Sequence, residues 1–339
     1  MAPGPAGAVA AGRVRLRPLD AATYSRHALH GEDRTWPETN CYVDLWIEVV
    51  HGLGLDPMPA LAFTLALDFE GDQYTFYKFG HTDLHDLYGI DVQELNVWKP
   101  LVEHAVEQVS MGRVLIPEAD SYWLPDTAGV SYRIEHTKSS IAIQDIDVAA
   151  RRLGYFHGAS YYQLEGEDFD GVFRLAPGLT GPNILPPFCE IAKLDKLEPL
   201  SDAALLERAV ALTRRYVARR PAANPIVRHY ERFARDLEWL RDSNSATLFH
   251  QYAFATFRQL GSCFEVAGSY VQWLGARGER GLEGAAGDCD TIAKTAKALQ
   301  FKLARAATLK RQIDVAESFE AMITSWDSAM KHLVARYGT

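Results

Sequence analysis

The chain has few cysteines, no excess of positive charge and no long apolar run. Its four cysteines lack CxxC spacing, so they indicate reduced thiols rather than a disulfide framework or a zinc site. The net charge of −9 argues against a nucleic-acid or anionic-membrane partner, because either partner requires a basic surface. No apolar stretch reaches membrane-spanning length, and residues 1–12 lack the pattern of a signal peptide. We therefore expect a cytoplasmic protein.

The pattern of apolar residues changes once along the chain, near residue 198. With 339 residues, 47% of them hydrophobic, there is enough chain for two domains with separate cores. The first part mixes a helix at 97–111 with strands at 114–116, 131–134, 140–147, 153–157, 161–164 and 188–194. The second part predicts helices at 201–220, 225–241, 246–274 and 288–337, the last broken near 310–314. The sequence thus predicts an α+β protein with a flexible tail (1–25), a mixed domain (26–198) and a helical bundle (199–339).

Cys41 is predicted to lie in the first turn of an amphipathic helix. Apolar residues recur at helical spacing over residues 42–53, and Asn40 precedes the thiol where it can cap the helix. At a helix start, unpaired backbone amides and the helix dipole favour a thiolate, which is the reactive form of cysteine. The same amides can hold the oxygen of an acyl intermediate on the sulfur. The plainer alternative is that Cys41 is a small apolar residue packing the first turn.

His136 is the residue that we predict to act as the base for Cys41. It follows the cysteine by 95 residues and stands next to Glu135 at the head of an expected strand. A nucleophile on an early helix and a base on the sheet beneath it is the order found in papain-like folds. The imidazole would take the thiol proton and later donate it to a leaving group. The alternative is a solvated histidine at a strand edge.

Strand geometry limits which residue can orient the imidazole of His136. At about 3.3 Å per residue, Asp145 and Asp147 fall at a distant hairpin turn, and the following strand returns beside His136. The available partners on that strand are His157, Gln163 and Glu165. We favour His157 as the third catalytic residue and leave the other two open.

Three further residues are predicted to bind substrate: Asn40, Asp120 and Tyr122. Asp120 follows a buried strand, from which it can hold a substrate amine or orient another side chain. An equally simple hypothesis is that Asp120 caps the backbone amides that come directly after it. Tyr122 lies two residues farther along the same turn.

Several motifs in the first half resemble known families. The runs RVLIPEADSYWLP (113–125), YRIEH (132–136) and IAIQDID (141–147) resemble the amino-terminal domain of butirosin biosynthesis protein H and its relatives. That family is similar to cysteine-peptidase-like transferases, which move an acyl group from a carrier-protein thioester to an amine. The blocks LGYFH (153–157) and LEGEDF (164–169) resemble the family called domain of unknown function 1839. Its members have a helical carboxy-terminal half and are associated with loading amino acids onto carrier proteins.

The resemblance implies that residues 26–198 form a papain-like catalytic domain. The expected activity is transfer of an acyl or aminoacyl group from a carrier-protein thioester, through Cys41, to a small-molecule amine. The expected partner is an acyl or aminoacyl carrier protein, and no cofactor is expected beyond the phosphopantetheine that carries the donor. The alternatives are a thioesterase or amidase with the same dyad, and a non-catalytic protein that binds a loaded carrier.

Two weaker patterns complete the sequence predictions. His81 and His85 have metal-ligand spacing, but the glutamate of an HExxH motif is missing, so we predict no metal site. A basic spot is formed by Arg214, Arg215, Arg219 and Arg220. It is either a solvated helix face or the docking site of an acidic carrier protein.

Overall fold

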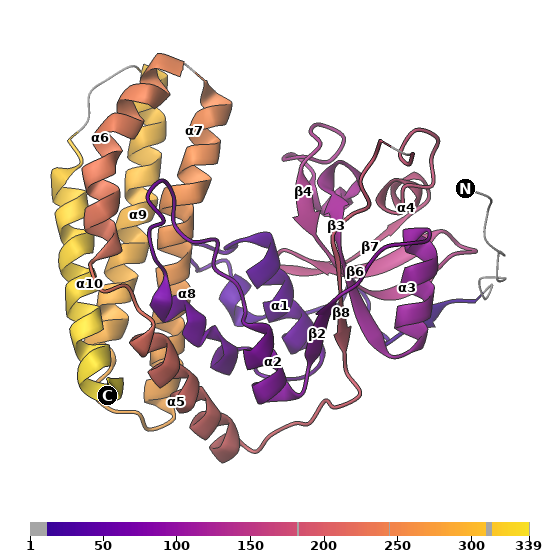
Figure 1. Ribbon diagram of the computed structural model, residues 1–339, viewed down its shortest axis with the longest axis horizontal. Helices are drawn as coiled ribbons and strands as arrows, with labels where there is room; N and C mark the ends of the chain where they lie inside the picture. The colour runs from indigo at the N-terminus through magenta and orange to yellow at the C-terminus, as the bar shows by residue number, and fades with distance from the viewer. Residues whose placement is uncertain (1–11, 182, 244, 310–313, 339) are drawn as a thin grey trace. The chain divides into compact units, whose positions relative to one another are not determined.

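The computed structural model describes residues 12–181, 183–243, 245–309 and 314–338. The chain divides into two compact units (Figure 1). Unit 1 comprises residues 1–28, 41–55 and 84–199. Unit 2 comprises residues 29–40, 56–83 and 200–339. The described elements confirm the α+β class, and no helix among them is both long and apolar enough to cross a bilayer.

Unit 1 is built on an antiparallel sheet. Its strands are β1 (Val14–Arg15), β2 (Asp91–Glu94), β3 (Arg113–Asp120), β4 (Lys138–Ser140), β5 (Ala142–Asp147), β6 (Arg152–His157), β7 (Ser160–Glu165) and β8 (Cys189–Lys193). The main strand order is β2-β8-β3-β5-β6-β7, with β1 paired to β5 and β4 paired to β3. The predicted strands at 114–116, 140–147, 153–157, 161–164 and 188–194 are therefore confirmed, with shifted ends.

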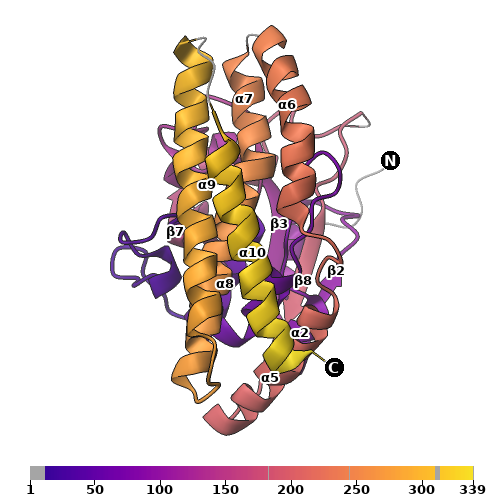
Figure 2. The ribbon, with the colours of Figure 1, turned by 90° about the vertical axis from the view of Figure 1, so that its left-hand side faces the viewer.

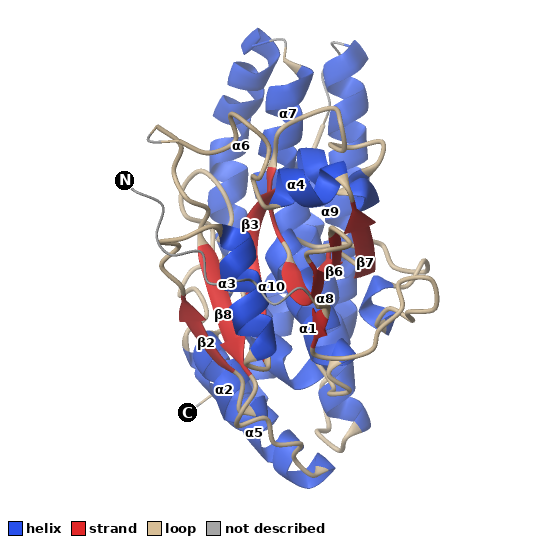
Figure 3. Cartoon of the chain, turned by 90° about the vertical axis from the view of Figure 1, so that its right-hand side faces the viewer, coloured by secondary structure: helices blue, strands red, loops and turns tan. Residues whose placement is uncertain are grey.

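Helices cover both faces of the sheet. α3 (Leu101–Ser110) and α4 (Glu167–Val172) lie on the face turned toward the viewer in Figure 3, and their apolar residues join one core cluster with that face. α1 (Cys41–Gly52) packs on the opposite face against β4, β6 and β7. A side chain on Gly52 would meet the ring of Phe156, because a Cβ there would lie 2.5 Å from Phe156 Cζ. Glycine thus permits the close approach of the helix end to β6.

The helix that begins at Cys41 is buried on all sides. Every residue from Tyr42 to Val50 is buried, so α1 is a central helix, buried also on the face that the amphipathic pattern leaves polar. Full burial of Leu45 or Ile47 stabilises the fold by about 2 kcal/mol each. The buried Glu48 carboxylate accepts a hydrogen bond from the Tyr24 hydroxyl at 2.7 Å.

The first described residues are tied to unit 1. β1 pairs with β5, the Arg13 guanidinium forms an ion pair with Asp145, and the Arg17 guanidinium donates to the Gly52 carbonyl at 2.8 Å. The sequence predicted a flexible tail over residues 1–25. These contacts hold residues 13–17 to the rest of unit 1, and residues 1–11 lie outside the described part of the chain.

The predicted strand at 131–134 is wrong. The chain turns there: the amides of Ile134 and Glu135 both donate to the Ser131 carbonyl, and Arg133 adopts a positive φ of 56°. The segment belongs to a loop, residues 121–137, which contains the short 3-10 helices η3 (Ser121–Trp123) and η4 (Pro125–Thr127). Tyr and Ile gave the segment a strand-like composition, but its hydrogen bonds are local.

Unit 2 is mainly a bundle of long helices (Figure 2). They are α5 (Asp202–Ala218), α6 (Pro225–Ser243), α7 (Ala246–Ala253), α8 (Gln259–Ala276), α9 (Glu283–Leu309) and α10 (Ala316–Tyr337). The predicted helix at 246–274 is interrupted by a π-helical turn, η5 (Phe254–Arg258), whose Ala255 carbonyl accepts from the Tyr74 amide. The predicted break near 310–314 falls mostly on residues 310–313, outside the described part.

Two segments from the amino-terminal half belong to unit 2. In residues 29–40, the Glu265 carboxylate of α8 accepts the backbone amides of Thr35 and Trp36 at 2.8 and 2.7 Å. Residues 56–83 include the 3-10 helix η2 (Met58–Ala66), which packs against α5 and α8. The short 3-10 helix η1 (Ala28–His30) and α2 (His81–Tyr88) each contain a boundary between the units. Each compact unit therefore contains separate segments of the chain, whereas the predicted domains, 26–198 and 199–339, are continuous.

Candidate functional site

Cys41 differs from the other three cysteines in its surroundings. It is the first residue of α1 and is half-buried, whereas Cys189, Cys263 and Cys289 are buried. Burial raises the pKa of the Cys189 and Cys289 thiols to about 12, and raises that of Cys263 well above its ordinary value. These three thiols are therefore protonated at neutral pH and poor nucleophiles. Cys41 is the cysteine with access to solvent.

His136 is held by Asp120. Its Nδ1 lies 2.6 Å from Asp120 Oδ2, and the imidazole is largely exposed, at 68% of its side-chain surface. A carboxylate only accepts hydrogen bonds, so Nδ1 must carry the proton. In the neutral ring this assignment leaves Nε2 with a free lone pair, as a general base requires.

Asp120 and Tyr122 fix the position of the ring. Asp120 ends β3, and its second oxygen accepts the Tyr122 amide at 3.1 Å. The Tyr122 ring then stacks on the imidazole of His136, with centroids 4.4 Å apart and planes inclined by 14°. Asp120 therefore caps the Tyr122 amide and also orients the His136 ring, and its binding of a substrate amine stays a prediction.

The Asp120 carboxylate points to the sheet face that α1 covers. Alternate residues of β3, Leu115 and Ala119, belong to the core under α3 and α4, so Asp120 faces the other way. On that other face, Tyr42 in the first turn of α1 donates to Glu190 of β8 at 2.7 Å. The aspartate that holds His136 thus shares a sheet face with the helix that begins at Cys41.

Cys41 and His136 are not joined by a hydrogen bond. Within the residues that the structure describes, the Cys41 sulfur has no hydrogen-bonding partner, and the recorded contact of the His136 ring nitrogens is the one to Asp120. The structure therefore brings together Asp120, Tyr122 and His136, and places Cys41 at the start of α1 without a hydrogen bond to His136 among the described residues.

His157 does not orient His136. Its Nδ1 lies 2.5 Å from Asp126 Oδ2 and its Nε2 lies 2.7 Å from Ser139 Oγ, so both ring nitrogens are occupied elsewhere. The Tyr155 hydroxyl donates to the other oxygen of Asp126 at 2.5 Å. The rise per residue along a strand correctly predicted the end of the sheet at which β6 ends. It gives no information on the loop that supplies Asp126.

The remaining predicted residues lie outside this cluster. Gln163 and Glu165 are exposed on β7. Asn40 is buried in unit 2, where its side-chain amide donates to the Tyr77 carbonyl at 3.1 Å. His81 and His85 lie on α2, and the described residues include no cluster of three or more side chains suited to hold a metal.

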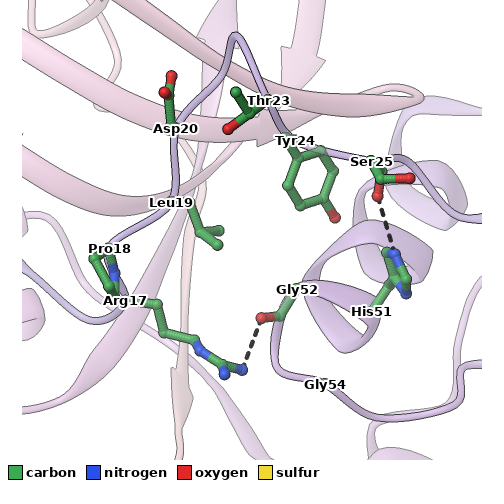
Figure 4. Close-up of a pocket in the computed structure, with 10 residues that line it drawn as sticks. All are labelled: Arg17, Pro18, Leu19, Asp20, Thr23, Tyr24, Ser25, His51, Gly52 and Gly54. Carbon is green, nitrogen blue, oxygen red and sulfur yellow. Dashed lines mark hydrogen bonds between the residues drawn. The ribbon is translucent and has the colours of Figure 1, made fainter.

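A pocket of about 420 Å³ lies at the other end of α1 (Figure 4). Its lining includes Arg17, Leu19, Tyr24 and His51, and none of the predicted site residues. His51 Nε2 lies 3.1 Å from the Ser25 carbonyl, and Tyr24 is engaged by Glu48. Because neither Cys41 nor His136 lines the pocket, it is not the predicted catalytic cleft.

Sequence reasoning missed Asp126 and Ser139. Both are small polar residues in or beside a loop, without a spacing that marks them as partners of His157. Only the register Ala119↔Ser139, which follows from the pairing of β3 and β4, places Ser139 near the end of β6. That short pairing, of three residues, is not readable from composition.

Two family models cover most of the chain. Residues 25–194 match the DUF1839 N-terminal domain, and residues 202–335 match the DUF1839 C-terminal domain. No curated protein matches the chain.

Proposed function

The chain belongs to the DUF1839 family, and we propose that it is a cysteine-dependent acyltransferase with a papain-like catalytic domain. The observation that carries this proposal is the 2.6 Å contact between His136 Nδ1 and Asp120, because it leaves Nε2 free and because Asp120 lies on the sheet face that α1 covers. A central helix that begins at a half-exposed cysteine and packs on an antiparallel sheet supports the papain-like assignment. The relation to butirosin biosynthesis protein H is part of the proposal.

The proposed reaction has two halves. His136 Nε2 takes the Cys41 proton, and the thiolate attacks the carbonyl of a carrier-protein thioester. The tetrahedral intermediate collapses as the imidazolium returns the proton to the departing phosphopantetheine sulfur, which leaves an acyl-enzyme. An amine then attacks the acyl carbon, His136 takes the amine proton and the Cys41 thiolate leaves. Asp120 stabilises the imidazolium that forms in both halves.

The backbone at the start of α1 suits the intermediate. The first amides of a helix have no intrahelical partner, and the helix dipole adds positive potential there. An oxyanion that forms on a substrate bonded to Cys41 lies beside these amides. Water in place of the amine gives hydrolysis by the same steps, so the nature of the acceptor distinguishes a transferase from a thioesterase or amidase.

A second candidate function is favoured by the missing Cys41–His136 hydrogen bond. Without movement of the loop that carries His136, the base does not reach the thiol. The protein would then recognise a loaded carrier without transferring its acyl group. A covalent adduct on Cys41 separates the two candidates, because only the acyltransferase forms one.

The test of the proposed function is acyl-enzyme formation. On incubation with a panel of aminoacyl carrier proteins, we expect a mass increase equal to the acyl group, located on the Cys41 peptide by mass spectrometry. His136→Ala should slow adduct formation by about 10²-fold to 10⁴-fold, because the thiol loses its base. His85→Ala removes an exposed histidine of α2 and should react at the parent rate. Carrier binding without an adduct on Cys41 would favour the second candidate.

The arginines of the basic spot, in the last turn of α5 and directly after it, differ in their contacts. Arg215 forms an ion pair with the buried Asp83, whose other oxygen accepts from the Tyr216 hydroxyl at 2.6 Å. Arg220 donates to the Val217 carbonyl, and Arg219 lies over the Tyr216 ring. Arg215 is therefore a structural residue of unit 2, and Arg214 and Arg219 are the exposed arginines of the spot.

If α5 docks an acidic carrier, the double substitution Arg214→Glu and Arg219→Glu should raise KM for the carrier-bound donor about 10-fold at low salt. Free small thioesters should be used as before, since they do not need the docking surface. Arg215→Glu should instead lower the thermal unfolding midpoint, because Asp83 is left buried beside a second negative charge. Unchanged KM for the carrier in the double variant would remove α5 from the docking surface.

A further inference from the structure

His157 connects the two arms of the loop that carries the candidate site. The loop leaves β3 after Asp120 and returns into β4 at Lys138. Asp126 lies on the outgoing arm, and Ser139 follows the returning arm. One imidazole bridges them, because Nδ1 contacts Asp126 at 2.5 Å and Nε2 contacts Ser139 at 2.7 Å.

The same two arms carry the proposed acid–base pair. Asp120 starts the outgoing arm, and His136 lies on the returning arm, three residues before Ser139. At the base of the loop the Ser121 amide donates to the Thr137 carbonyl at 2.8 Å. The Asp120–His136 contact thus joins the same two arms that His157 joins from the opposite face of the sheet.

The bridge is buried and held from both sides. The side chains of His157 and Asp126 are 9% and 4% exposed, and Ser139 is buried. Tyr155 occupies the second oxygen of Asp126. A serine, histidine and aspartate in this order have the hydrogen bonding of a hydrolytic triad, but burial denies a substrate access to the serine oxygen. The burial of Asp126, His157 and Ser139 instead fits a role in holding the loop, residues 121–137, in place.

We propose that His157 is a positioning residue, which sets the Asp120–His136 geometry by joining the outgoing and returning arms of the loop through its two ring nitrogens. The expected effect of His157 on acyl transfer rests on the proposed function. The expected effect on the tautomer of His136 does not, because the contact with Asp120 sets the Nδ1–H form whatever the reaction is.

The experiment compares His157→Gln with the parent protein in two independent measurements. The first is the tautomer of His136, read from the ¹⁵N shifts of its imidazole nitrogens at a pH where the ring is neutral. We expect the Nδ1–H form to dominate in the parent and the Nε2–H form to gain in the variant, since a displaced loop loosens the bond to Asp120. Retention of the Nδ1–H form in a folded His157→Gln protein would overturn the proposal.

The second measurement is acyl transfer. His157→Gln should lower kcat about 10-fold and change KM less than about 2-fold, the effect expected of a residue that acts on the base through the loop that carries it. If the parent transfers no acyl group, the proposed function fails, and the tautomer result alone decides the positioning role.

A milder variant keeps the test informative if His157→Gln does not fold. Ser139→Ala removes one hydroxyl and leaves the His157–Asp126 pair in place, so it should shift the tautomer in the same direction by a smaller amount. His85→Gln, an exposed histidine outside the loop, is the matched control and should leave the His136 tautomer unchanged. An unchanged His136 tautomer in a folded Ser139→Ala protein would show that the bridge does not set the site.

Discussion

Replacing Cys41 with alanine should abolish acyl transfer, with a loss on the order of 10⁴-fold or more, while the fold is retained. The loss is large because the proposed reaction passes through a covalent bond to this sulfur, and no neighbouring group replaces a nucleophile. The fold should tolerate the change because the side chain is small, half-buried and without a hydrogen bond among the described residues. Turnover with a purified carrier-protein donor and the urea midpoint are the two measurements.

The other cysteines supply the control for this substitution. Cys189→Ala removes a thiol that burial keeps protonated, so it should leave turnover unchanged and cost some stability. Iodoacetamide near neutral pH should alkylate Cys41 well before the three buried thiols, and carrier-bound donor should protect it. Undiminished turnover by Cys41→Ala would remove the covalent mechanism.

Apolar periodicity predicted the regular elements of this protein well. β6 and β7 follow alternating or continuous apolar patterns, and α5 and α6 carry apolar residues at helical spacing, so their existence is fixed by local chemistry. The π-helical turn in the predicted helix at 246–274 was not predictable, because it arises where the Ala255 carbonyl turns to accept the distant Tyr74 amide. Periodicity carries no information about such a long-range bond.

The candidate site was predictable in its residue types and only partly in its contacts. Sequence order placed Cys41 at a helix start and gave His136 as a base, whose role in catalysis stays a prediction. The partner of His136 depends on a loop of local turns, in which positive φ at Arg133 reverses the chain. The rise per residue gives distances along strands and not through loops. It therefore favoured His157 over Asp120 as the residue that orients the His136 imidazole.

The sequence also could not predict which segments belong to which compact unit, because that too depends on long-range contacts. Residues 29–40 and 56–83 precede most of the mixed half, yet they belong to unit 2 because side chains from its helices bind them. Glu265 accepts two backbone amides of the first segment, and Arg215 pairs with Asp83 of the second. These contacts join residues more than 130 positions apart, a separation that no pattern of neighbouring residues encodes.

His229 is the residue expected to control the stability of unit 2 in mild acid. It lies on α6 and has no exposed surface. Its ring is surrounded by aromatic rings from α6 itself, from α10, from η5 and from residues 69–74: Phe69, Tyr74, Phe233, Phe257 and Phe319. Its Nε2 lies 3.3 Å from the Tyr252 hydroxyl, and no carboxylate contacts the ring within the described residues. Burial therefore lowers the pKa of His229 from 6.5 to about 3.

The lowered pKa means that the folded state keeps His229 neutral while the unfolded state takes up a proton. The stabilisation is fully present above pH 6.5 and is lost progressively as the pH falls toward 3. Between pH 7 and pH 5 the free energy of unfolding should fall by about 2 kcal/mol from this residue, or about 30-fold in the unfolding equilibrium. Carboxylates in their ordinary range contribute little to this interval. Burial also lowers the pKa of His104, so a variant of His229 is needed to separate the contribution of His229.

Urea titrations at pH 7 and pH 5 measure this fall directly, by the change in the midpoint at constant slope. His229→Phe places an uncharged ring of similar size among the same aromatic residues, so the variant should lose about 2 kcal/mol less than the parent over this interval. His250→Gln is the matched control, because His250 on α7 is exposed and its removal should leave the parent's pH dependence in place. An equal fall in the parent and in His229→Phe would show that protonation of His229 is not coupled to the unfolding of unit 2.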